Sequence, residues 1–133
     1  MERFVKAQEG VYATALAELQ AGEKESHWMW FIFPQLRGLG FSPMAYTYGI
    51  TGVDEARAYL AHPVLGPRLV ACCEALLTHP DLTAEDILGD VDAMKLRSSM
   101  TLFAHISEPD AVFHRVLAQF CDGQPDERTL SML

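Results

Sequence analysis

The sequence lacks any uninterrupted apolar run that approaches the roughly 20 residues of a membrane-spanning helix. Basic residues are also few, with 10 Lys and Arg against 18 Asp and Glu, which gives a formal net charge of −8. An acidic chain is not attracted to the phosphate backbone of nucleic acids. The first ten residues include acidic and polar side chains where a secretory signal has an apolar core. We therefore expect a cytoplasmic protein that binds neither a membrane nor a nucleic acid.

Cysteine is scarce, and the three cysteines, Cys72, Cys73 and Cys121, form no CxxC motif. On a helix the neighbouring Cys72 and Cys73 point about 100° apart, so they form neither a disulfide nor half of a zinc site easily. The sequence also lacks the usual patterns of a metal site. It has no HExxH motif, no histidine pair one turn apart with a carboxylate, and no cluster of acidic residues. We expect free thiols, no metal and no cofactor. Whether the protein is an enzyme stays open.

The composition is that of a globular protein, with 50% hydrophobic and 21% charged residues. A chain of 133 residues suits one domain with one hydrophobic core. Apolar residues recur three and four positions apart along most of the chain, as in amphipathic helices. This pattern, with its capping residues, predicts helices over residues 3–21, 42–50, 54–62, 64–78, 83–89, 90–107 and 111–121. We predict a single all-α domain over residues 1–133.

The predicted helix over residues 90–107 is the most apolar one. Leu96, Met100 and Phe103 form one stripe, and further apolar residues cover much of the remaining surface. A helix that is apolar on most sides is usually buried among other helices. We therefore expect this helix at the centre of the fold.

Residues 26–40, SHWMWFIFPQLRGLG, hold an unusual concentration of aromatic residues. Ser26 suits the cap of a short helix over residues 27–33, which Pro34 would end. A short strand is the alternative, because Trp, Phe and Ile are favoured in both kinds of buried segment. Such aromatics more often form a core than a stacking surface. Gln35 and Arg37 are better candidates for ligand contact, because the glycines beside them leave them unobstructed.

A second candidate set lies on the predicted central helix. Lys95, Ser98 and Ser99 share one face, because they are three and four positions apart. A lysine with neighbouring hydroxyl groups suits a phosphate or a carboxylate. The alternative is that both serines bond back to carbonyls one turn earlier while Lys95 extends to solvent. The order K-x-x-S is the reverse of the S-x-x-K of a Ser–Lys nucleophile, so no catalytic pair is indicated.

The strings SHWMWFIFPQLRGLG, HPVLGPRL and KLRSSMTLF, in this order, resemble the bacterial family catalogued as domain of unknown function 1810. Some of its members carry an unsupported calpastatin label. The resemblance extends from Arg3 to about Gly123 and implies a small multihelical fold, but no activity, substrate or cofactor. One departure is Gly49, where the family pattern has Ala, and we expect it to loosen its helix. The recurring polar residues of the family correspond here to Ser26, His27, Gln35, Ser42, Arg68, Lys95, Ser98, Ser99 and Thr101.

Two hypotheses for function follow. The first is a pocket between residues 26–40 and 95–101 that binds a small anionic ligand, for which a nucleotide is one candidate. The predicted ligand-binding residues are His27, Trp28, Gln35, Arg37, Ser42, Lys95, Ser98, Ser99 and Thr101. The second is a protein–protein interaction module or homo-oligomer without catalysis, in which exposed aromatics and Arg37 form the contact surface. Burial of Trp28 and Trp30 would favour the pocket.

Overall fold

The computed structural model describes all 133 residues and contains ten α-helices and no β-strand. The all-α prediction is therefore confirmed. The helices are α1 (Glu2–Gln8), α2 (Tyr12–Ala21), α3 (Met29–Ile32), α4 (Pro43–Thr47), α5 (Val53–Ala61), α6 (Leu65–Leu77), α7 (Ala84–Leu88), α8 (Asp90–His105), α9 (Val112–Phe120) and α10 (Glu127–Ser131). No single helix is long and apolar enough to cross a membrane, and the pair α5 and α6, which passes that test jointly, is bent by 87°.

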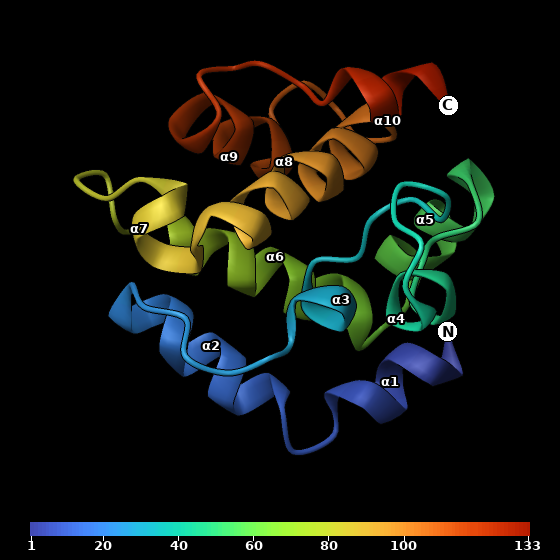
Figure 1. Ribbon diagram of the computed structural model, residues 1–133, viewed down its shortest axis with the longest axis horizontal. Coiled ribbons are helices and arrows are strands. Elements are labelled where there is room, and N and C mark those ends of the chain that lie inside the picture. Colours follow the sequence, from blue (N-terminus) through green and yellow to red (C-terminus); the bar gives the residue numbers. More distant parts are fainter.

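Helix α8 is the longest and lies at the centre of the molecule, as predicted (Figure 1). It packs against α5, α7, α9 and α10. Helices α9 and α10 lie on one side of it, and α1 and α2 form the opposite edge of the molecule (Figure 1). Its buried residues include Leu96, Met100 and Phe103, the three of the predicted stripe. Central burial follows from the apolar surface of this helix.

A chain of aromatic rings runs through the core and connects four helices. The Phe4 and Tyr59 rings meet edge to face with 5.1 Å between centroids. Tyr59 lies 5.5 Å from Phe103, and Phe103 lies 5.7 Å from Phe113. Such tilted and edge-to-face pairs stabilise a core beyond the area they bury. They join α1, α5, α8 and α9 into one hydrophobic cluster.

The predicted helix over residues 3–21 is wrong in one respect, because it is broken into α1 and α2. The break lies at Gly10, whose φ of +70° belongs to the left-handed region that glycine adopts without strain. The bend leaves Gln8 buried at the end of α1. Its side-chain nitrogen donates to the Phe31 carbonyl at 2.7 Å and to the Tyr59 hydroxyl at 3.2 Å. The break thus places a polar connection between the first helix and the aromatic segment.

The aromatic segment over residues 26–40 also differs in detail from the prediction. Only Met29–Ile32 is helical, and Ser26 does not cap this helix. The strand alternative for residues 27–33 is wrong, because no strand forms there. An isolated parallel bridge joins Leu36 to Ile50 further along the chain. In that bridge the Ile50 N–H donates to the Gln35 carbonyl at 2.9 Å. The helix predicted over residues 42–50 is therefore shorter than expected. It ends as α4 at Thr47, and Ile50 takes part in the bridge instead.

Gly49 does not loosen a helix, contrary to the expectation, because it lies beyond the end of α4. It is where two segments approach closely. A Cβ atom at this position would lie 2.6 Å from Arg37 Cβ and 2.7 Å from the Ala45 carbonyl oxygen. The backbone therefore needs glycine here for lack of space.

Several helix starts follow local rules. Ser42 Oγ accepts from the Ala45 N–H at 3.1 Å, and Thr83 and Asp86 form a capping box. The start of α6 uses a histidine instead. Nδ1 of His62 accepts from the N–H groups of Val64 and Leu65 at 3.1 and 3.2 Å. Side chains thus satisfy free N–H groups at the first turns of three helices.

Candidate functional site

A cavity of about 300 Å³ opens where the aromatic segment meets the first half of α8 and the start of α10. On α8 the lining residues are three and four positions apart, so they form one face. The segment after α3 forms the second wall, and the residues around the start of α10 form the third. The lining residues are Trp30, Gln35, Leu39, Gly40, Val91, Met94, Lys95, Ser98, Asp126 and Arg128.

Lys95 is held in place on the wall of this cavity. Its Nζ lies 3.9 Å from the centroid of the Trp30 ring, a cation–π distance. It also lies 3.2 Å from Oδ1 of Asp92, whose Oδ2 lies 3.0 Å from Nζ of Lys24. One carboxylate is thus shared by two ammonium groups. The two ammonium groups carry two positive charges and the carboxylate carries one negative charge, so positive charge remains beside the cavity.

Gln35 presents an unpaired amide to the same cavity. The residue is only 9% exposed, and its side chain makes no hydrogen bond to the protein. Its backbone is fixed, because its carbonyl accepts from Ile50 in the bridge between the two segments. Ser98 is similarly buried, and its Oγ donates a long 3.3 Å bond to the Met94 carbonyl. Both side chains therefore retain hydrogen-bonding capacity toward the cavity.

The chain end supplies the third wall, which the sequence did not predict. Oδ2 of Asp126 accepts from the N–H and the hydroxyl of Thr129 at 2.9 and 2.6 Å, so Asp126 caps α10. The Asp126 N–H donates to Thr101 Oγ1 at 2.9 Å, which attaches this turn to α8. Arg128 is exposed and makes no ion pair. No helix was predicted for these residues, and nothing in the sequence indicated where they would pack.

The structure brings three of the nine predicted ligand-binding residues together, Gln35, Lys95 and Ser98. His27 is exposed on the loop before α3 and does not line the cavity. Ser99 is fully buried, and its Oγ has no hydrogen-bond partner. Thr101 is buried as well, where its hydroxyl donates to the Arg97 carbonyl at 2.7 Å and accepts from Asp126.

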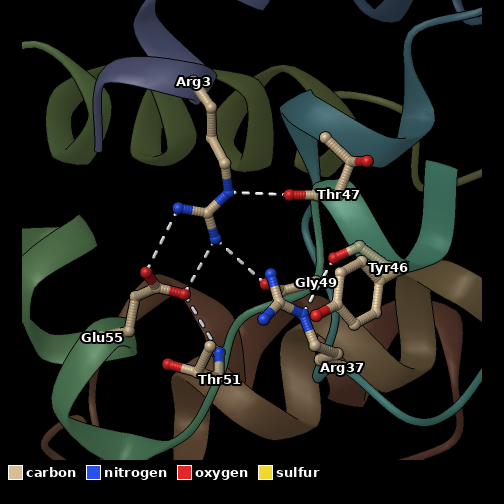
Figure 2. A network of polar contacts seen from close by, with 7 residues as sticks. All are labelled: Arg3, Arg37, Tyr46, Thr47, Gly49, Thr51 and Glu55. Carbon is tan, nitrogen blue, oxygen red and sulfur yellow. Dashed lines mark hydrogen bonds and ion pairs between the residues drawn. The ribbon is translucent and has the colours of Figure 1, made fainter. Parts of the chain in front are cut away.

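The other three predicted residues have structural roles away from the cavity. Trp28 is fully buried and donates from Nε1 to Glu18, and Ser42 caps α4. Arg37 lies against Tyr46, with its Cζ 4.4 Å from the ring centroid and its Nε 2.8 Å from the Tyr46 carbonyl (Figure 2). Trp30 and Arg128, which the prediction left out, line the cavity instead.

Glu18 organises the loop that leads into the aromatic segment. Its carboxylate accepts from the N–H of Glu25, from the N–H and hydroxyl of Ser26, and from Trp28 Nε1 at 2.6 to 3.0 Å. Desolvation raises the pKa of this carboxyl, but the hydrogen bonds, led by that of Ser26, outweigh it and lower the pKa to about 2. Ser26 and Trp28 are thus engaged in holding the backbone.

A second polar network connects the N-terminal helix to residues 47–55 (Figure 2). The Arg3 guanidinium donates to the carbonyls of Thr47 and Gly49 at 2.8 and 3.0 Å and to both carboxylate oxygens of Glu55 at 2.9 and 3.2 Å. Desolvation raises the pKa of Glu55, but the bonds from Arg3 and Thr51 lower it overall. Since every nitrogen of Arg3 has a partner, this network is a structural connection.

The cysteines are free and buried. Desolvation raises the pKa of Cys72 to about 12 and also raises those of Cys73 and Cys121, so the thiols stay protonated at neutral pH. No group of three or more His, Cys, Asp or Glu side chains could hold a metal ion.

The family model described as "Protein of unknown function (DUF1810)" matches residues 1–133. The crystal structure of the conserved hypothetical protein Rv1873 from Mycobacterium tuberculosis is similar to this chain, with a TM-score of 0.97 and 48% sequence identity. The match covers 99% of this chain and 94% of that one. None of the curated proteins matches the chain.

Proposed function

The chain belongs to the DUF1810 family of proteins of unknown function, and we propose that it binds a small anionic ligand in the cavity beside α8. The observation that supports this most is the shared carboxylate of Asp92. Because it is paired with both Lys24 and Lys95, it neutralises neither of them fully. Arg128, which has no ion pair, adds a second positive group to the lining. Asp126 is the one acidic residue of the lining, so the two basic residues leave the lining with a net positive charge that an anion would balance.

Lys95 suits such a role because its side chain is already ordered. The Trp30 ring and Asp92 hold the ammonium group at the cavity, so binding loses little of its side-chain entropy. A hydrogen bond from a charged group contributes about 1.5–3 kcal/mol. The apolar side chains of Leu39, Val91 and Met94 provide contact area around the polar groups. Apolar walls with a few convergent polar groups are typical of ligand sites.

The alternative, an interaction surface made of the aromatic segment, has less support. Trp28, Phe31 and Phe33 are buried in the core, and Trp30 is half-buried under Lys95. Arg37 is engaged with Tyr46. The side chains that would have formed the contact surface are therefore turned inward or occupied.

Calorimetric titration with inorganic phosphate, ribose 5-phosphate, AMP and GMP tests the proposal. We expect at least one probe to bind, and Lys95→Met to raise its Kd at least about tenfold, the equivalent of one charged hydrogen bond. Methionine keeps the length and apolar stem of lysine while removing the charge. Lys6→Met is the matched control, because Lys6 is exposed on α1, away from the cavity.

Two results would overturn the proposal. One is that none of the four probes binds to the wild-type protein. The other is that Lys95→Met and Lys6→Met bind every probe as well as the wild type does.

A further inference from the structure

We infer that the anionic ligand also carries a planar group with a hydrogen-bond donor beside an acceptor, as on the edge of a nucleobase, and that the Gln35 amide binds that edge. This inference rests on the proposed function and identifies the ligand class as a nucleoside monophosphate. It starts from one observation. Gln35 is nine-tenths buried and lines the cavity, yet its side chain has no partner in the protein.

A largely buried polar side chain without a partner in the protein bonds to water or to a ligand. The side-chain atoms that are enclosed without a partner are Ser99 Oγ and His114 Nε2. Since neither amide atom of Gln35 is among them, the amide reaches solvent, and it does so along the cavity that the residue lines. An approaching ligand can therefore contact both atoms.

The chemistry of the Gln35 amide limits which ligand groups can bind to it. Its oxygen accepts and its nitrogen donates, at neighbouring positions in one plane. Two bonds form together only with a group that offers a donor and an acceptor side by side. The backbone of Gln35 is held in place, because its carbonyl accepts from the Ile50 N–H. The amide therefore extends from a fixed point on the cavity wall.

The rest of the lining agrees with a planar ring joined to an anion. Leu39 and Met94 offer apolar and polarisable contacts for a ring, whereas the Trp30 face is occupied by Lys95. Lys95 and Arg128 attract the phosphate, and the Ser98 hydroxyl can add a hydrogen bond. A volume of about 300 Å³ lies at the lower end of ligand sites and fits one nucleotide better than a dinucleotide.

Binding of AMP, GMP and UMP compared with ribose 5-phosphate tests the inference, because ribose 5-phosphate has the anion without the base. We expect at least one nucleotide to bind at least about tenfold more tightly than ribose 5-phosphate. In Gln35→Met, which keeps the shape and removes the amide, that preference should disappear while the Kd for ribose 5-phosphate stays unchanged. Gln124→Met, at an exposed position outside the cavity, should keep the preference.

The outcomes separate the inference from the proposed function. If ribose 5-phosphate binds as tightly as every nucleotide and Lys95→Met weakens all of them equally, the inference is overturned and the anion site stands. If Gln35→Met keeps the preference for a nucleotide, the inference is also overturned. If no probe binds, both fail. Should Gln35→Met not fold, the comparison of ligands on the wild-type protein decides alone.

Discussion

The indole of Trp28 is fully buried, and its Nε1 donates a 2.8 Å hydrogen bond to Oε1 of Glu18, a residue on the surface-facing side of α2. The largest side chain of the core is thus oriented by a carboxylate at the rim. The same carboxylate binds the backbone of residues 25–26. Core packing and loop conformation therefore depend on a single ionised group.

This pairing predicts a loss of stability in acid. The pKa of Glu18 is lowered from 4.5 to about 2 in the folded chain. A carboxyl with a depressed folded pKa stabilises the native state above its unfolded pKa, and the contribution is lost as pH falls through the folded pKa. Denaturant unfolding should therefore show this contribution disappearing between about pH 4.5 and pH 2.

Glu18→Gln tests the assignment. It should cost about 1 kcal/mol at pH 7, since a neutral acceptor bonds more weakly than a charged one, and should reduce the acid dependence. Glu23→Gln is the control, because the exposed Glu23 side chain makes no hydrogen bond in the native structure. If both variants keep the acid dependence of the wild type, another carboxyl causes it.

A second prediction concerns the close approach at Gly49. Gly49→Ala should destabilise the fold by about 1–3 kcal/mol, because the added methyl group would overlap Arg37 and the Ala45 carbonyl. Gly52→Ala is the matched control, since a Cβ there has no atom within 4 Å, and it should cost less than about 1 kcal/mol. Thermal and urea unfolding measure both. Equal costs would show that the space around Gly49 is not limiting.

A third prediction separates two neighbouring serines. Ser99→Ala should leave stability unchanged or raise it by up to about 1 kcal/mol, because it removes a buried hydroxyl without a partner and introduces the best helix former. It should not affect anion binding, since Ser99 does not line the cavity. Ser98→Ala, by contrast, removes a hydroxyl group from the lining of the cavity. A Ser99→Ala variant that melts well below the wild type would mean that the hydroxyl is bonded after all.

The fourth prediction concerns Arg3 and Glu55. A double-mutant cycle with Arg3→Met and Glu55→Gln should give a coupling energy of about 1 kcal/mol, near the upper limit for partly exposed pairs, because two donors meet two acceptors. The coupling should decrease in about 1 M salt, where the Debye length is only about 3 Å. A coupling near zero at low salt would contradict this view of the network.

The parts of the fold that the sequence predicted depend on neighbours along the chain. The Ser42 cap and the Thr83–Asp86 capping box each involve residues three apart, so spacing alone identifies them. The central position of α8 followed from its apolar surface. The break at Gly10 was not predicted, because the helical spacing of apolar residues continues across it and does not show that the chain turns there.

The candidate site was predicted only in part for the same reason. Lys95 and Ser98 share a helix face, which spacing shows, and Gln35 follows a proline that ends the aromatic segment. Trp30 and Arg128 join them through the packing of segments far apart in sequence, which no local pattern specifies. Trp28 is bonded to Glu18, ten positions earlier, and the sequence does not show that pairing.

The ion pairs of Asp92 have a consequence for distant parts of the molecule. Lys24 belongs to the loop after α2, where its Nζ also donates to the Ser26 carbonyl and lies 4.9 Å from the Trp28 ring centroid. Its carboxylate partner is the one that Lys95 uses beside the cavity. The two ion pairs share one carboxylate, so their energies are coupled, and by reciprocity Lys24 changes the pairing of Lys95 by the same free energy as Lys95 changes that of Lys24. A substitution at Lys24 therefore acts at the cavity without touching it.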